Sequence, residues 1–243
     1  MGKVFAVTSG KGGVGKSTVS IGLALAFCAK AKKVLLVDMD EGLRCLDLML
    51  GVDKSTVFDL SDILLGKDIA DAVYNPEKIK GLSLIPAPSQ IGMIDAFSLA
   101  GFADQAKQKY DIVIFDFPAG MDFSLYTALP EDTLFLTVAS PDPVSVRDAA
   151  AVRQELNKLK LNSRLIINNF DYGIMRHGIH KNVDDIIDAA ALQLVGIVPH
   201  SEELSFFSVL HTLKRKGNAM KAFCRIADRL EGKNVLLPKP KKI

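Results

Sequence analysis

Short apolar runs alternate with segments of helical periodicity along most of the chain. The runs rich in valine, isoleucine, leucine and phenylalanine predict strands at Lys3–Thr8, Lys33–Asp38, Leu82–Pro86, Ile112–Phe117, Thr133–Val138, Arg164–Asn168 and Val195–Val198. Apolar residues at helical spacing predict helices at Lys16–Ala29, Asp59–Leu65, Leu99–Lys109, Pro143–Leu159, Val183–Leu192 and Ala219–Leu230. This alternation is typical of parallel strands that are joined by helical crossovers.

The predicted strands carry few polar residues. The run from Ile112 to Phe115 is continuously apolar, so both of its faces should be covered, as they are in the centre of a parallel sheet. Right-handed crossovers then place helices on both sides of the sheet. We therefore predict an α/β fold in a single domain, with a doubly wound, mostly parallel sheet flanked by helices.

A glycine-rich loop joins the first predicted strand to the first predicted helix. Residues 10–18 read Gly-Lys-Gly-Gly-Val-Gly-Lys-Ser-Thr, and the order strand, loop, helix is the context that a phosphate-binding P-loop requires. The glycines let main-chain N–H groups surround phosphate oxygens, and the helix N-terminus adds partial positive charge. Lys16 is expected to reach the β- and γ-phosphates of a nucleotide, and the Ser17 hydroxyl to bind Mg²⁺.

Composition and charge narrow the class of protein. The chain has 243 residues, of which 49% are hydrophobic, and this is enough for one large α/β domain. The formal net charge of +2 is too small to imply a strong electrostatic partner and by itself argues neither for nor against DNA or anionic lipid. We expect no specific nucleic acid partner. Cys28, Cys45 and Cys224 form no Cys-x-x-Cys pair, and they are interpreted as reduced thiols of a cytosolic protein. No segment has the pattern of a signal peptide or of a membrane span.

Acidic residues follow two of the predicted strands. Asp38 and Asp40 come after the strand at Lys33–Asp38, and Asp116 ends the run that begins at Ile112. Carboxylates at the ends of strands near a P-loop hold Mg²⁺, usually through water, or orient the attacking water. A nucleotide site with three such carboxylates is therefore predicted, and Gly120 is a candidate hinge for a loop that senses the γ-phosphate.

Two segments resemble a known family. The second lysine of the P-loop, Lys11, gives the form Lys-Gly-Gly-Val-Gly-Lys-Ser-Thr, which resembles the deviant Walker A motif of the MinD/ParA ATPases. Residues 37–51 look like the first switch region of the MinD branch, which has Gly-Leu-Arg followed by Leu-Asp-Leu. ParA proteins usually place Pro-Gln after the second aspartate, where this chain has Glu41 and Gly42, so the MinD branch is favoured. Together with Ser145–Asp148 and Val195–Pro199, the resemblance predicts an ATPase domain over residues 1–232.

The resemblance implies a role for each matching residue. Lys16 and the amides of the loop would hold the phosphates of ATP, Asp40 would position the hydrolytic water, and Lys11 would cross to the nucleotide of a second copy. Ser17 would bind Mg²⁺, and Asp38 and Asp116 would act on its water shell. The remaining implied contacts to ATP come from Gly12, Gly13, Val14, Gly15 and Thr18 around the phosphates and from Asn168, Asn169 and Pro199 around the adenine.

The function implied by the resemblance is an ATP-dependent dimerisation switch. It would hydrolyse ATP to ADP and phosphate with Mg²⁺, form a homodimer, and work with cell-division regulator proteins to place the division site. The alternatives are a MinD-like regulator of flagellar number and a ParA-type partition ATPase. ATP-dependent metabolic ligases of this fold generally lack a lysine at position 11, and the iron–sulfur carriers and nitrogenase-type reductases bridge a cluster with cysteines, whereas Cys45 and Cys224 are isolated.

Residues 233–243 form a basic, proline-containing tail. Pro238 and Pro240 forbid a continuous helix there, and the apolar stretch Val235–Leu237 is too short for the amphipathic helix that binds a membrane in MinD proteins. We expect the tail to be disordered and to give no support to membrane association. The expected location is the cytoplasm, with peripheral binding at the inner membrane as the alternative.

Overall fold

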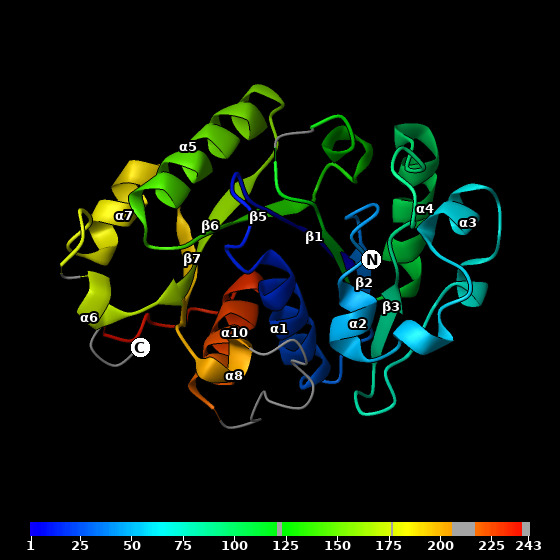
Figure 1. Cartoon of the computed structure of the whole chain (residues 1–243), viewed down its shortest axis with the longest axis horizontal. Coiled ribbons are helices and arrows are strands. Elements are labelled where there is room, and N and C mark those ends of the chain that lie inside the picture. The colour runs from blue at the N-terminus through cyan, green and yellow to red at the C-terminus, as the bar shows by residue number, and fades with distance from the viewer. Residues whose placement is uncertain (121–122, 176, 206–216, 240–243) are drawn as a thin grey trace.

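The computed structural model describes residues 1–120, 123–175, 177–205 and 217–239. They form three layers, a central sheet with helices on both of its faces (Figure 1). The sheet has seven parallel strands in the order β3-β2-β4-β1-β5-β6-β7. The strands are β1 (Lys3–Thr8), β2 (Val34–Asp38), β3 (Leu82–Ile85), β4 (Ile112–Asp116), β5 (Leu134–Ala139), β6 (Ser163–Phe170) and β7 (Leu194–Pro199). The predicted parallel sheet is confirmed.

Helices connect the strands. The α-helices are α1 (Lys16–Cys28), α2 (Leu46–Leu50), α3 (Leu60–Leu64), α4 (Ala96–Lys109), α5 (Pro143–Lys158), α6 (Tyr172–Met175), α7 (Val183–Ala190), α8 (Glu202–Ser205) and α10 (Asn218–Leu230). Helix α4 begins before the predicted Leu99 because the Asp95 side chain accepts a hydrogen bond from the Ser98 N–H at 2.9 Å and caps the helix. None of the helices described is long and apolar enough to span a lipid bilayer.

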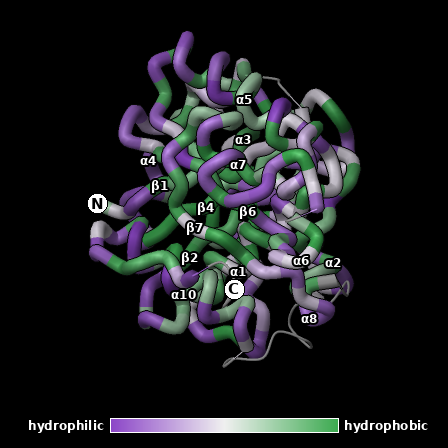
Figure 2. The backbone as a smooth tube through the Cα atoms, turned by 90° about the vertical axis from the view of Figure 1, so that its left-hand side faces the viewer, coloured by the Kyte–Doolittle hydropathy of each residue, from purple (hydrophilic) through white to green (hydrophobic). Residues whose placement is uncertain are grey.

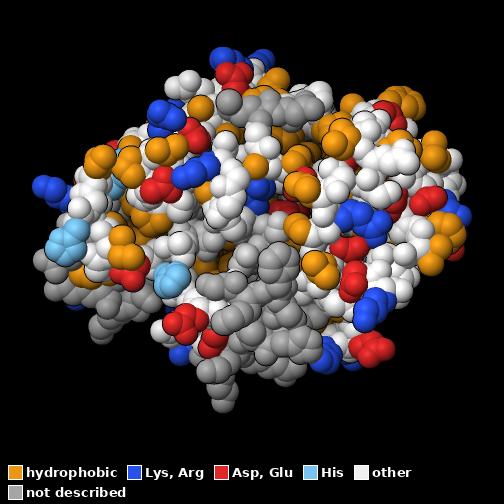
Figure 3. Space-filling model, in the orientation of Figure 1, with side chains coloured by type: hydrophobic (Ala, Val, Ile, Leu, Met, Phe, Trp, Pro, Cys, Tyr) orange, Lys and Arg blue, Asp and Glu red, His pale blue; other side chains and the backbone are white. Residues whose placement is uncertain are grey.

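The two faces of the sheet are covered by different helices. On β1, Phe5 and Val7 belong to the core under α1 and α10, whereas Val4 and Ala6 belong to the core under α4 and part of α5. This is the alternation expected of a strand that is buried on both sides. The hydrophobic segments accordingly lie mostly inside and the hydrophilic ones mostly outside (Figure 2). On the face shown in Figure 3, acidic and basic side chains are interspersed.

Helices α1 and α10 approach each other closely at Gly22. The side chain of Phe223 is fully buried, and a Cβ atom added to Gly22 would lie 2.3 Å from its ring. Glycine weakens the interior of a helix, but here it makes room for an aromatic ring of the neighbouring helix.

The strand order brings the predicted site residues together. Strand β4 lies between β1 and β2, so that Asp116 is the register partner of Val7 on one side and of Asp38 on the other. Because all strands are parallel, the P-loop after β1 and the ends of β2 and β4 meet at one edge of the sheet. Ligands of open α/β sheets bind at this carboxyl edge.

Candidate nucleotide-binding site

The P-loop ends at Gly15, which lies directly before α1. Gly15 has a φ of 87° in the left-handed region, and a Cβ atom at this position would lie 2.3 Å from Nδ2 of Asn168. A side chain is therefore excluded both by the backbone angle and by the close neighbour. Helix α1 has no side-chain cap and no acidic residue in its first turn. Its first N–H groups are left for an anion, as in phosphate-binding helices.

The two lysines of the loop lie in different surroundings. Lys16 is only 9% exposed and stands at the start of α1, where its charge acts on Asp40 and Asp116. The side chain of Lys11 is 40% exposed, and its Nζ lies 3.2 Å from Oδ1 of Asp142. That aspartate also caps α5 by accepting a hydrogen bond from the Ser145 N–H at 3.0 Å. Although burial acts to raise the pKa of Asp142, hydrogen bonds from Ser140, Ser145 and Lys11 hold it below the usual value.

Asp38 and Asp116 are both about 1% exposed and lie side by side at the strand ends. Burial raises the pKa of Asp38 to about 7, with a further contribution from the charge of Asp116. Burial also raises the pKa of Asp116 to about 6, although the hydroxyls of Ser17 and Ser20 oppose this, with Ser20 Oγ at 2.7 Å from Oδ1. Within the described residues neither carboxylate has an ion-pair partner within 4.0 Å.

These groups fit the chemistry of Mg²⁺. A hydroxyl on Ser17 and two buried, unpaired carboxylates are hard oxygen donors, and Mg²⁺ usually takes one or two protein ligands and completes its shell with water and phosphate oxygens. A cation would also offset the electrostatic cost that raises the two pKa values. The thiol of Cys45 lies next to this position, with Sγ at 3.4 Å from Ser17 Oγ. Burial raises the pKa of that thiol to about 11, so it is neutral at pH 7.

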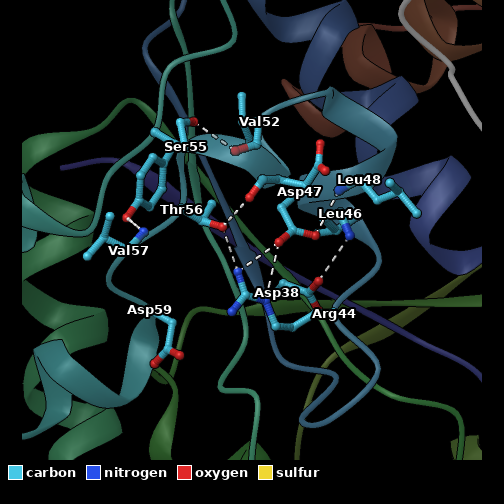
Figure 4. A network of polar contacts seen from close by, with 12 residues as sticks. Asp38, Arg44, Leu46, Asp47, Leu48, Val52, Ser55, Thr56, Val57 and Asp59 are labelled. Atoms are coloured by element: carbon cyan, nitrogen blue, oxygen red, sulfur yellow. Dashed lines mark hydrogen bonds and ion pairs between the residues drawn. The ribbon is translucent and has the colours of Figure 1, made fainter.

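The segment after β2 folds back over the strand ends (Figure 4). The carboxylate of Asp38 accepts hydrogen bonds from the backbone N–H groups of Asp40 at 3.0 Å and of Leu46 at 3.1 Å. Arg44 reaches Asp47 at 2.8 Å and Thr56 at 2.9 Å. The segment that carries Asp40 is thus fixed on Asp38, and the carboxyl group of Asp40 is half-buried with its pKa raised by burial, against the effect of Lys16.

A cavity of about 270 Å³ adjoins the P-loop. It joins residues predicted for phosphate binding to those predicted for the adenine: its lining includes Gly13, Val14, Gly15, Thr18, Asn168, Asn169 and Pro199. Asn168 is buried and donates from Nδ2 to the carbonyl oxygen of Val14 at 2.8 Å. Asn169 is exposed, has a φ of 56°, and places Oδ1 at 2.5 Å from Nδ1 of His200. Gly12 is exposed at the tip of the loop, and a Cβ there would lie 3.9 Å from the side chain of Ala119.

The sequence did not point to several residues that contact the predicted site. Ser20 stands one helical turn after Ser17 and could have been found by that spacing. Asp142 precedes a proline at the start of α5, which signals a helix cap but not a contact with Lys11. Glu41 accepts hydrogen bonds from a distant loop, and no local pattern indicates this.

Comparison with known proteins gives consistent matches over nearly the whole chain. The sequence matches the AAA domain family over residues 2–169. The septum site-determining protein MinD of Synechocystis sp. is 32% identical over 251 residues, which cover 97% of this chain and 91% of that protein. The structure of the MinC:MinD cell division protein complex of Aquifex aeolicus is similar, with a TM-score of 0.87 and 31% identity, and 98% of each chain is covered.

A nucleotide-bound structure is also similar. The septum site-determining protein MinD from Pyrococcus horikoshii, complexed with Mg-ADP, has a TM-score of 0.80 and 26% identity, and the match covers 95% of this chain and 96% of that chain. The predicted resemblance and fold class are both confirmed by these matches. The chain belongs to the MinD family of P-loop ATPases.

Proposed function

We propose that this protein is a Mg²⁺-dependent ATPase that forms a homodimer when ATP is bound and takes part in placing the division site. The observation that carries the proposal is the position of Lys11. Lys16 already supplies a buried positive charge beside the first turn of α1, whereas Lys11 stands at the exposed tip of the loop. A lysine placed there can meet the nucleotide of a second copy that faces the same edge of the sheet.

Each residue then has a role in hydrolysis. The N–H groups of the P-loop and of the first turn of α1, together with Lys16, hold the phosphates. Ser17, with Asp38 and Asp116 acting through water, would hold Mg²⁺, which adds positive charge next to the phosphate oxygens when bound.

The other predicted residues have separate roles. The phosphate site is completed by Gly12, Val14 and Thr18. The adenine is contacted by Asn168, Asn169 and Pro199. Asp40 orients the attacking water. Lys11 of the second copy stabilises the charge of the transition state, a task for which arginine fingers supply about 10³–10⁵ in rate.

The cellular role and the partner rest on similarity. The relatives are septum site-determining proteins, and one similar structure is a MinC:MinD complex. These matches support a cell-division regulator of the MinC kind as partner. Deletion of the gene is expected to misplace septa. Normal septa with an altered number of flagella would instead support the flagellar alternative.

Light scattering after gel filtration tests the dimer. The wild-type protein should be monomeric with ADP, and an Asp40→Ala variant, in which hydrolysis is blocked, should be dimeric with ATP. Adding Lys11→Ala should prevent the dimer while ATP affinity changes by less than about tenfold, or about 1.4 kcal/mol. Lys158→Ala is the control, because Lys158 is 70% exposed and, among the residues described, forms its ion pair with Glu155 on its own helix.

A persistent dimer in the Lys11→Ala background would reject the role of Lys11. Calorimetry with Lys16→Ala tests the nucleotide site itself, because loss of the buried lysine should abolish ATP binding. Unchanged ATP affinity in that variant would reject the P-loop assignment as a whole.

A further inference from the structure

The backbone around Asp40 is held on one side by the ends of the strands. The Met39 N–H donates to the carbonyl oxygen of Asp116 at 3.0 Å, and the Asp40 N–H donates to Asp38 at 3.0 Å. The N–H groups of Leu43 and Arg44 both lie 3.2 Å from the carbonyl oxygen of Asp40 and close a turn. These contacts fix where the turn begins, but none of them reaches beyond the site.

On its other side the same segment is fastened to the loop between β3 and α4 by Glu41. The Glu41 carboxylate accepts hydrogen bonds from three successive backbone N–H groups: Oε2 from Gly92 at 2.9 Å, and Oε1 from Met93 and Ile94 at 2.8 Å each. Successive N–H groups that converge on one anion form a concave binding site for it, and hydrogen bonds to a charged acceptor are stronger than neutral ones. The neighbouring Gly42 N–H adds a bond to the carbonyl oxygen of Pro88 at 3.0 Å.

Packing joins the two segments mainly at Ile94. Ile91 is 83% exposed and Met93 is 38% exposed, whereas Ile94 is 9% exposed and belongs to the same hydrophobic cluster as Met39. The three hydrogen bonds of Glu41 add a polar contact that holds the N–H groups of residues 92–94 on the segment of Asp40.

We propose that Glu41 is a positioning residue for ATP hydrolysis: by binding the N–H groups of residues 92–94 it fixes the backbone from which Asp40 projects. The proposal rests on the proposed function for the role of Asp40. The groups that would hold the phosphates come from the P-loop and α1, and Glu41 contacts none of them. Its loss should therefore lower kcat and leave ATP affinity nearly unchanged.

Amide hydrogen exchange followed by NMR, together with ATPase kinetics, tests the proposal on the variants Glu41→Ala and Glu41→Gln. The control is Glu77→Ala, which replaces an exposed glutamate. In Glu41→Ala the amides of Gly92, Met93 and Ile94 should exchange about tenfold faster or more, since each loses a charged acceptor. In the same variant kcat should fall about tenfold or more, with ATP affinity within about threefold.

Glu41→Gln gives the rescue measurement. Its single carbonyl oxygen can still accept from Met93 and Ile94, whereas its NH₂ group faces the Gly92 N–H and cannot accept from it. Exchange at Gly92 should therefore rise more than exchange at the other two amides, and kcat should lie between the values of wild type and Glu41→Ala. Glu77→Ala should change neither quantity.

Two results would overturn the proposal. Unchanged exchange at residues 92–94 in Glu41→Ala would show that the contact does not form in solution. Faster exchange with kcat within twofold of wild type would show that the contact forms but does not position Asp40. Amide exchange needs no ATPase activity, so it distinguishes these results from failure of the proposed function, in which the wild-type protein itself would not hydrolyse ATP.

Discussion

At the scale of single residues, the three aspartates at the carboxyl edge of the sheet differ in their contacts. Asp38 and Asp116 are buried and accept hydrogen bonds from the backbone or from serine, whereas the half-buried carboxyl group of Asp40 has no hydrogen bond to its own turn within the part of the chain that the structure describes. We predict that Asp40→Ala keeps ATP affinity within about threefold and lowers kcat by about 10²–10⁴, the contribution usual for a group that assists proton transfer or orients water. Calorimetry with ATP and a phosphate-release assay measure the two quantities.

The control for this prediction is Asp53→Ala, because Asp53 is exposed in the 3₁₀ turn after α2. It should behave as wild type in both assays. Turnover of Asp40→Ala within twofold of wild type would move the role in hydrolysis to another residue, and a large loss of ATP affinity would instead make Asp40 part of the binding site.

At the scale of whole elements, the contact between α1 and α10 depends on the missing side chain at Gly22. Gly22→Ala should lower the free energy of unfolding by about 1–3 kcal/mol, because the new methyl group would overlap the buried ring of Phe223. Gly101 on α4 is the matched control, because a Cβ there has no atom within 4 Å. Gly101→Ala should raise the free energy of unfolding by about 0.5–1 kcal/mol through better helix propensity. Urea unfolding of both variants checks the opposite signs.

The elements that the sequence predicted are those with a local pattern. The buried strands, the P-loop and the long helices each have a period or a run that a short window contains, and they were found to within a few residues. Short helices such as α2 and α8 have no such period. The contacts of Lys11 with Asp142 and of Glu41 with Ile94 join residues 131 and 53 positions apart, and they exist only because the strand order brings their loops together. No window of sequence contains them.

At the scale of the whole molecule, an ion-pair network joins the end of α1 to the end of α10. Lys30 lies 2.7 Å from both Asp228 and Glu231, and these groups are 19–27% exposed. Hydrogen bonds from Lys233 and Lys30 lower the pKa of Asp228, and chiefly Lys30 lowers that of Glu231. A lowered carboxyl pKa stabilises the folded state above the unfolded pKa values, and this contribution is lost as the pH falls through the folded ones.

Replacing Lys30 should therefore lower the free energy of unfolding by an amount that depends on pH. Lys30→Gln should lower the free energy of unfolding by about 1 kcal/mol at pH 7, and the difference from wild type should shrink as the pH falls below the ordinary carboxyl pKa values of 3.8 and 4.5. Urea titrations at pH 7 and at two pH values below 3.8 measure this trend. A difference that stays constant or grows on acidification would show that Lys30 acts by packing alone. Lys158→Gln, on an exposed pair, should have almost no effect at any pH.

The basic tail sets the expected behaviour of the molecule at a membrane. Its described part, residues 233–239, has no helix, and Arg229 Nε donates to the carbonyl oxygen of Val235 at 2.8 Å; residues 240–243 lie outside the described residues. We predict weak or no sedimentation with anionic liposomes in the ATP state, because Pro238 and the following Pro240 prevent an amphipathic helix. Strong ATP-dependent sedimentation that disappears when residues 233–243 are deleted would contradict this.

The strand order also determines when each strand of the newly made chain can first pair with a neighbour. Strand β1 pairs only with β4 and β5, which begin at Ile112 and Leu134, whereas β2 and β3 can pair with each other earlier. At about 5–20 residues per second, β1 leaves the ribosome on the order of 5–20 s before its first partner is made. During that interval the glycine-rich loop has been synthesised, but the strands that pair with β1 are not yet present. A nascent chain should therefore acquire affinity for ATP only after β4, which ends at Asp116 of the 243 residues, has emerged.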